Sequence, residues 1–176
     1  MSGILARKVG MTRIFQEDGI VTPVTVLSCP PSTITQVKTQ DKHGYNAIVL
    51  GFIPLKHPRK TKKFKTLKEF RVEKPEDFKI GDEVTVESFK DVKEVMLTSR
   101  SKGKGTAGVM KRHHFHSGPG SHGSHFNREP GSIGARSKPG RIHKGKRMAG
   151  RMGFENVTIK NIPLVQVIAE KNLILV

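Results

Sequence analysis

The pattern of apolar and polar positions predicts short β-strands over most of the chain. Residues 20–28 are rich in β-branched side chains, residues 33–39 alternate apolar and polar positions, and residues 45–53 are almost continuously apolar. Alternation indicates a strand with one buried face, whereas a continuous apolar run indicates a strand buried on both faces. We therefore expect residues 45–53 to lie in the centre of a sheet. Pro23 has no backbone N–H to donate, so the first half of its strand should lie at a sheet edge.

The rest of the apolar pattern predicts further strands separated by turns. His43-Gly44 is a plausible turn, and Asn172 can adopt the left-handed conformation in a turn before the last strand. About eight short strands without a convincing amphipathic helix favour a mainly β fold, a small closed β-barrel, for which roughly 120 residues suffice. The further strands are expected at residues 83–89, 92–98, 156–162, 164–169 and 173–176.

Residues 100–153, which we call the arm, interrupt this pattern. Their apolar side chains follow neither a 3.6-residue nor a 2-residue period, and the arm contains 12 of the 18 glycines and six of the eight histidines. Such a segment cannot bury enough surface to offset the entropy lost on ordering. It is therefore either a disordered insert or an arm that a partner orders. We expect residues 1–99 and 154–176 to form one β-barrel domain into which the arm is inserted as a long irregular loop.

The distribution of charge suggests the partner. The chain has 32 lysines and arginines against 15 acids, a net charge of +17, and the arm alone holds 13 bases against one acid, Glu129. Such concentrated basicity points to a polyanion bound mainly at one place. Nucleic acid is favoured over an anionic membrane, because the arm has no amphipathic helical face. A second basic run at residues 56–68 is either a solvated loop or a second RNA contact.

The glycines of the arm do not form a nucleotide-hydrolysing site. Residues 140–146 match the spacing G-x4-G-K, but Arg147 stands where a phosphate-binding loop needs a hydroxyl group, and no predicted strand precedes them. Glycines still let backbone N–H groups approach phosphates closely, while adjacent lysines and arginines neutralise them.

Five histidines of the arm are candidate metal ligands. Zinc and copper sites need rigidly held ligands with partners that orient them, whereas these histidines lie among glycine, serine and proline. Contact with RNA or with solvent is therefore favoured over metal. The arm also lacks a nucleophilic serine motif and paired carboxylates, so we expect no enzyme, no cofactor and no metal. The five are His113, His114, His116, His122 and His125.

The cysteine content and the hydropathy of the chain indicate the cellular compartment of the protein. The single cysteine, Cys29, excludes an intramolecular disulfide and indicates a buried, inert thiol. No run of about 18 apolar residues occurs, and the start of the chain lacks the apolar core of a secretory signal. We expect a soluble intracellular protein that is not a homo-oligomer and does not bind a membrane.

The spacing of the bases favours RNA over DNA. They lie two to four residues apart through glycines and prolines, with only Phe115 and Phe126 interleaved. This arrangement suits threading between RNA helices, whereas the DNA major groove takes a rigid helix or ribbon. Phosphate and shape recognition should dominate. The alternatives are a generic nucleic-acid-binding chaperone or nucleoid-type protein and, on the histidines, a metal-dependent enzyme.

Motifs in a fixed order along nearly the whole chain resemble the large-subunit ribosomal protein L-three family of the bacterial type. They are KVGMTRIF at 8–15, SKGKG at 101–105, KR at 111–112, HGS at 122–124, PGSIG at 130–134 and KGKRMAG at 144–150. The resemblance implies a structural constituent of the large ribosomal subunit, in the cytoplasm or an organelle, that binds ribosomal RNA and neighbouring ribosomal proteins. It further implies a translation-protein-type β-barrel, a role early in subunit assembly near the 3′ end of the RNA, and a loop that reaches toward the peptidyl transferase centre.

This resemblance and the basic pattern assign RNA contacts to two parts of the arm. The two legs would bind phosphates through Lys102, Lys104, Lys111, Arg112, His113, His114, Lys144, Lys146, Arg147 and Arg151. The tip, nearest the peptidyl transferase centre, would act through His125, Arg128, Arg136, Ser137, Lys138 and Arg141.

The chain departs from the bacterial pattern in three places. The segment between Gly51 and Glu69 is shorter, so contacts made by a longer segment do not carry over. The chain ends at Val176 without the glycine-proline turn and final strand of many members, so we expect less complete barrel closure or an edge covered by RNA or a neighbour. Ser137 stands where some members carry a methylated glutamine, and that modification does not carry over either.

Overall fold

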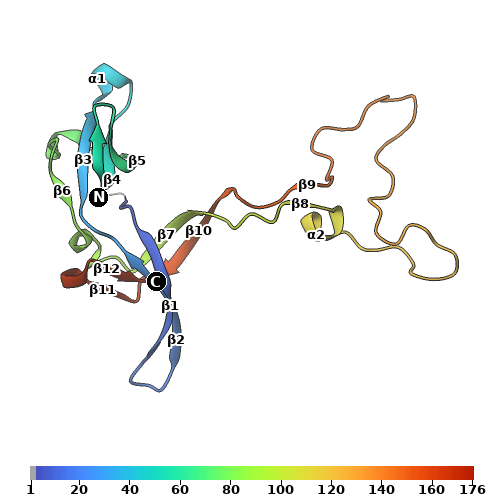
Figure 1. The fold of residues 1–176 in the computed structure, drawn as a ribbon, viewed down its shortest axis with the longest axis horizontal. Coiled ribbons are helices and arrows are strands. Elements are labelled where there is room, and N and C mark those ends of the chain that lie inside the picture. The colour runs from blue at the N-terminus through green and yellow to red at the C-terminus, as the bar shows by residue number, and fades with distance from the viewer. Residues whose placement is uncertain (1–2) are drawn as a thin grey trace. The chain divides into compact units, whose positions relative to one another are not determined.

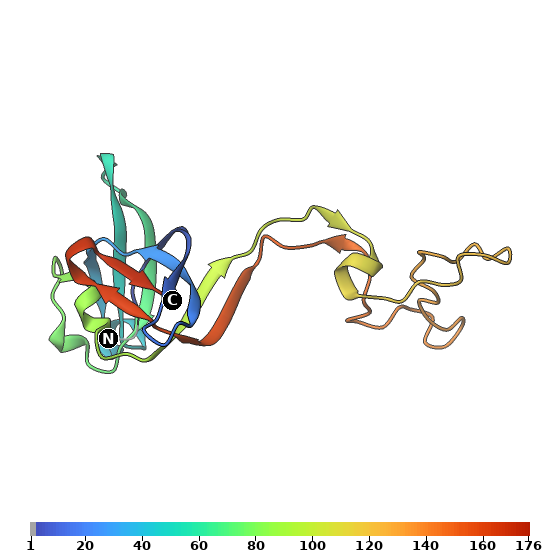
Figure 2. The same ribbon diagram turned by 90° about the horizontal axis from the view of Figure 1, so that it is seen from below.

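A computed structural model describes residues 3–176, which are mainly β-strand (Figures 1 and 2). The chain divides into two compact units, one of Met1–Met96 with Lys160–Val176 and one of Leu97–Ile159. We call the second of these the arm unit. Within residues 3–176, no helix is both long and apolar enough to cross a membrane.

One antiparallel sheet of the first unit joins the two ends of the chain. Asn172 has a φ of 51° and ends the short 3-10 helix η3 (Ala169–Lys171), as predicted, so that the chain turns back into its last strand. That strand pairs with only the second half of β2, which leaves Pro23 in the half that pairs on one side alone. The predicted edge position of Pro23 is confirmed. The order in this sheet is β1 (Arg7–Phe15), β2 (Val21–Ser28), β12 (Leu173–Leu175) and β11 (Gln166–Ile168).

A second four-stranded sheet contains the predicted central strand. Ala47, Ile48 and Leu50 of that strand are fully buried, which confirms the interpretation of its continuous apolar run. The short helix α1 (Gln40–His43) precedes it, and Gly44 ends this helix with a φ of 76°, where a turn was expected. The order in this sheet is β5 (Lys62–Arg71), β4 (Ala47–Arg59), β3 (Ser32–Lys38) and β6 (Glu83–Val84).

The core of the first unit consists of two apolar clusters. One contains Ile34, Ile48, Leu50 and Val84, and the other contains Cys29, Val86 and Ile174. Val84 and Val86 therefore serve different clusters although only one residue separates them. The chain bends between them into the 3-10 helix η2 (Val86–Phe89), where the Ser88 hydroxyl donates to the Thr85 carbonyl (2.9 Å). The single strand predicted at residues 83–89 is thus wrong beyond Val84.

The expected closed barrel is not found among the described residues, whose strands divide into separate sheets. Two features of the sequence interrupt the hydrogen-bonded ladder. Pro30 and Pro31 stand between β2 and β3 and have no N–H groups with which to carry the ladder from one sheet to the other. The bend after Val84 also leaves β6 only two residues long.

The basic run at residues 56–68 is not a loop. It forms the outer part of the β4–β5 hairpin, in which Arg59 pairs with Lys62 around a turn at Lys60 and Thr61. Close packing fixes the inner part of the hairpin: a side chain added at Gly51 would lie 2.7 Å from the Phe64 ring. The interpretation of this run as a solvated loop is therefore wrong, because the run forms two paired strands and a turn.

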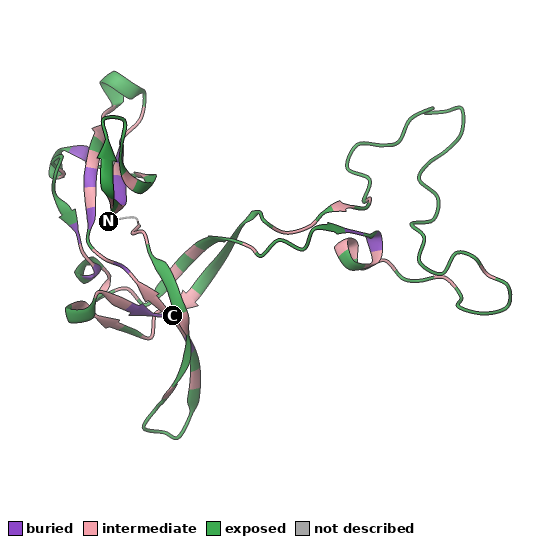
Figure 3. Ribbon diagram, in the orientation of Figure 1, coloured by how far each residue is buried: buried purple, intermediate pink, exposed green. Residues whose placement is uncertain are grey.

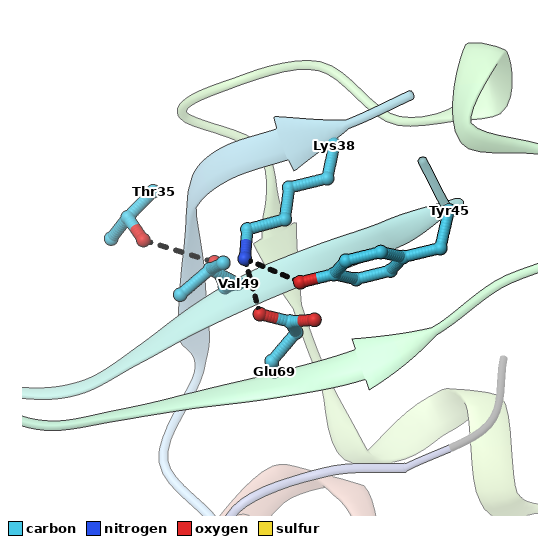
Figure 4. Close-up of polar contacts among 5 residues, drawn as sticks. All are labelled: Thr35, Lys38, Tyr45, Val49 and Glu69. Carbon is cyan, nitrogen blue, oxygen red and sulfur yellow. Dashed lines mark hydrogen bonds and ion pairs between the residues drawn. The ribbon is translucent and has the colours of Figure 1, made fainter. Parts of the chain in front are cut away.

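A polar cluster ties the edge strand β5 to β3 across the central strand (Figure 4). Lys38 on β3 donates hydrogen bonds to the Glu69 carboxylate (2.6 Å) and to the Tyr45 hydroxyl (2.9 Å). The hydrogen bond to Glu69 is the main reason that the pKa of Lys38 is raised, and the same bond lowers the pKa of Glu69. Both groups are therefore held in their charged forms at neutral pH.

The buried thiol of Cys29 supplies a pH-dependent prediction. Burial raises the pKa of Cys29 from 9.0 to about 11, so the folded state holds the neutral thiol. Its contribution to stability is full below pH 9.0 and is lost as the pH rises toward 11. At pH 8, iodoacetamide should therefore alkylate the native protein at least about 100-fold more slowly than the protein in urea, since only the thiolate reacts. Native and unfolded rates within threefold of each other would contradict the burial.

Candidate nucleic-acid interface

The base of the arm is held by pairing between its two legs. These legs continue β7 (Glu94–Arg100) and β10 (Asn156–Pro163), which form a two-stranded sheet. The hydroxyl oxygens of Thr98 and Thr158 lie 2.9 Å apart in a hydrogen bond. Farther along, the Ser101 N–H donates to the Glu155 carbonyl (2.9 Å). The long basic segment thus begins as a paired ribbon.

The next pair of backbone hydrogen bonds between the legs depends on a glycine. The Lys104 N–H donates to the Met152 carbonyl, and the Met152 N–H donates to the Gly105 carbonyl, both at 2.9 Å. Gly153 has a φ of 75°, and a side chain there would overlap the backbone carbonyl of Lys102. Only glycine combines this conformation with such a close approach of the opposite leg.

Arg100 has a partner within the arm unit. Its guanidinium carbon lies 3.8 Å from the centre of the Phe154 ring, and its Nε donates to the Phe154 carbonyl (3.2 Å). The ring remains 64% exposed, so this cation–π contact is of the weaker, solvated kind. Nothing in the sequence near either residue indicates this pair, because the two lie 54 positions apart.

A second ordered point lies farther along the arm, where the sequence predicted no regular structure. The strands β8 (Thr106–Ala107) and β9 (Gly150–Arg151) pair, and the short helix α2 (Val109–His113) follows β8. Ala107 and Val109 are buried. This helix is a single turn of five residues, too short to produce a detectable 3.6-residue period.

Two of the predicted phosphate ligands bind the opposite leg at this point. Arg112 Nη1 donates to the Met148 carbonyl (2.8 Å), and His113 Nε2 donates to the same oxygen (3.0 Å). A side chain at Gly150 would lie 2.7 Å from Arg112 Nη1, so the glycine leaves room for the guanidinium. We call Arg112, His113 and Met148 the clasp. In this structure Arg112 and His113 are half-buried and join the two legs.

The other predicted leg residues are exposed, and none of them takes part in an ion pair among residues 3–176. Lys104 and Arg151 lie on opposite legs, where the Lys104 N–H donates to the carbonyl of Met152, the residue after Arg151. Lys144, Lys146 and Arg147 gather around a tight turn, in which the Lys146 N–H donates to the His143 carbonyl (3.2 Å). The remaining exposed leg residues are Lys102, Lys111 and His114.

The tip beyond the clasp is exposed throughout residues 125–147, drawn green in Figure 3. Its backbone hydrogen bonds are few and local, such as that from the Gly118 N–H to the Asn127 carbonyl (3.1 Å). Within residues 3–176 no group of three or more histidine, cysteine or acidic side chains is placed to hold a metal ion. All six predicted tip residues lie in this region and are exposed: His125, Arg128, Arg136, Ser137, Lys138 and Arg141.

A mainly β protein with an exposed basic arm has the electrostatic footprint of a nucleic-acid-binding protein. The model of the family described as Ribosomal protein L3 matches residues 67–172. The chain belongs to this family, which confirms the resemblance of its motifs. Three similar proteins bear the name large ribosomal subunit protein uL3. That of Thermosipho africanus is 48% identical, with 100% of this chain and 90% of the relative aligned.

The two others cover the chain to a similar extent. The protein of Synechococcus sp. strain JA-2-3B'a(2-13) is 47% identical, with 99% of this chain and 87% of the relative aligned. The protein of Syntrophus aciditrophicus is 44% identical, with 98% and 85% aligned. The similarity thus extends over the first unit as well as the arm.

Replacing Gly153 tests the pairing at the base of the arm. Gly153→Ala would place a side chain against the Lys102 carbonyl, at a position with a left-handed backbone. The hydrogen bonds donated by the Lys104 and Met152 amides should therefore break. Hydrogen exchange should show loss of protection at these two amides. Gly108→Ala is the matched control, because Gly108 has a φ of −70° and nothing lies within 4 Å of an added side chain. Equal protection in both variants would contradict the packing described.

Hydrogen exchange of the unmodified protein tests the contrast between legs and tip. In the absence of RNA, the amides of Lys104 and Met152 should be protected by their hydrogen bonds. Most of those of residues 118–140 should exchange at close to the unprotected rate, since nearly all of this region is exposed and its backbone bonds are few and local. Strong protection across residues 118–140 in the free protein would show that the tip orders without a partner.

Proposed function

We propose that this protein is a structural component of the large ribosomal subunit that binds its RNA through the arm and performs no chemistry of its own. The exposed bases of the arm, which lack ion-pair partners in residues 3–176, carry the proposal. It is supported by family membership and by three relatives, 44–48% identical, that are named as large-subunit proteins. On the same grounds, its location is the ribosome of the bacterial cytoplasm.

The legs bind phosphates in this proposal. Exposed lysines and arginines on a paired ribbon present positive charge at fixed spacing, and each one that neutralises a phosphate releases counterions. Glycines between them let backbone N–H groups approach the RNA. Arg112 and His113 act mainly through the clasp, which sets the distance between the legs.

The tip completes the interface. It has few bonds of its own, so it becomes ordered by filling a crevice between RNA helices, and that crevice leads toward the peptidyl transferase centre. The first unit then docks the protein on the RNA and beside neighbouring large-subunit proteins. Binding of this kind, in which a basic segment folds against RNA, suits a protein that joins early in assembly.

Sedimentation and competition test the proposal. The protein should co-sediment with large subunits and remain bound through a wash at high salt, because an arm buried in RNA cannot dissociate contact by contact. It should also prefer large-subunit RNA to duplex DNA at physiological salt. Equal affinity for the two nucleic acids would favour the alternative of a generic chaperone or nucleoid-type protein.

A single leg lysine tests the phosphate contacts. Lys104→Ala should weaken RNA binding and reduce the slope of log K against log salt concentration by roughly one unit, the change for one lost phosphate contact. Lys42→Ala, at an exposed position of the first unit, is the matched control and should leave the slope unchanged. If neither Lys104→Ala nor the corresponding changes at Lys102 and Lys146 alter the slope, the legs do not bind phosphates.

A further inference from the structure

The β4–β5 hairpin carries the net positive charge of the first unit. Residues 56–71, which we call the basic hairpin, contain eight lysines or arginines and one acid, Glu69. The remainder of the first unit contains 11 bases and 12 acids, so it is close to neutral. The charge outside the arm is therefore concentrated on one short ribbon, as expected for a polyanion-binding site and unlike an evenly solvated surface.

The one acid of the basic hairpin forms its ion pair with a base outside the hairpin. Glu69 forms its ion pair with Lys38 of β3, at 2.6 Å, and this bond lies at the inner end of the hairpin (Figure 4). The other ion pair among residues 3–176 joins Lys90 and Glu87, outside the hairpin. Seven bases are thus exposed without an acidic partner in the described chain: Lys56, Arg59, Lys60, Lys62, Lys63, Lys65 and Lys68.

Protection of a sheet edge explains only part of this charge. β5 is an edge strand, and lysines on edge strands prevent pairing with other chains. Lys56 and Arg59, however, lie on β4, and Lys60 lies in the turn. These three do not guard the β5 edge, and together with the β5 lysines they leave charge on both strands and the tip of the ribbon.

We infer that the basic hairpin is a second RNA-binding surface, which contacts phosphates independently of the arm. Six of the seven bases without an acidic partner are lysines, which act as point charges on phosphate and do not offer the planar fork by which arginine reads guanine. The Phe64 ring packs against Gly51 and is half-buried, so it does not serve as a platform for stacking bases. The surface therefore binds the RNA backbone with little sequence preference. The identity of the polyanion as RNA rests on the proposed function.

A charge-neutralising variant with matched controls tests this inference. The triple variant Lys60→Gln, Lys62→Gln, Lys63→Gln should lower the slope of log K against log salt, measured on large-subunit RNA, by about two to three units. The control Lys42→Gln, Lys79→Gln, Lys171→Gln removes the same charge from exposed positions of the first unit and should leave the slope unchanged. The variant Lys60→Arg, Lys62→Arg, Lys63→Arg should retain the slope of the unmodified protein, because it keeps the charge. Circular dichroism and the melting temperature verify that each variant is folded.

The outcomes separate the basic hairpin from the arm. If Lys104→Ala lowers the slope but the hairpin triple variant does not, the inference is overturned and the proposed function stands. If neither changes it, both are overturned. An unchanged slope combined with poor incorporation of the triple variant into large subunits would assign the hairpin to an acidic protein surface and would also overturn the inference. Additive losses of slope in a combined variant would establish two separate contacts.

Discussion

Hydrogen bonds between the two legs are the constraint on which the arm depends. The legs share one sign of charge, and two unit charges 4 Å apart in water repel by about 1 kcal/mol, less in salt. A hydrogen bond contributes about 0.5–1.5 kcal/mol. The hydrogen bonds between the legs at Ser101, at Lys104 and at the clasp therefore outweigh the repulsion between charged side chains that are well spaced. Where these hydrogen bonds between the legs end, the chain has only local turns and few backbone bonds that fix its conformation.

The basic residues of the arm have two different roles. Arg100 stacks on Phe154, and Arg112 binds the Met148 carbonyl, so both hold the arm together. Lys102, Lys104 and Arg151 are exposed and have no acidic partner in the described chain. Small residues make the first role possible, since Gly150 and Gly153 allow the legs to approach closely. An arm of basic residues alone, without these glycines, would have no fixed distance between its legs.

The sequence predicts those features that local chemistry determines. The apolar run in β4, the edge position of Pro23 and the left-handed Asn172 each follow from a few neighbouring residues. Features that depend on distant partners were missed. β1 pairs with β2 although most of its side chains are exposed, and the basic hairpin shows no alternation because charged residues occupy both faces.

The same limit applies to the candidate site. Charge identified the arm and its exposed bases, but nothing near Arg112 in the sequence indicates a bond to Met148, 36 residues away. The prediction of a closed barrel was wrong for a related reason. Whether Val84 and Val86 extend one strand or enter two clusters is decided by the packing around them and not by their alternation.

The contact between Thr98 and Thr158 has a consequence for how such a chain can change during evolution. Sixty residues separate these two positions in sequence, yet their hydroxyl groups lie 2.9 Å apart. Whatever lies between them therefore enters and leaves the strand pair at a single point, as a loop does at a hairpin. Insertions, deletions or wholesale replacement beyond this point leave the two flanking strands in register. The length of the arm can therefore change without altering the pairing of the strands that carry it.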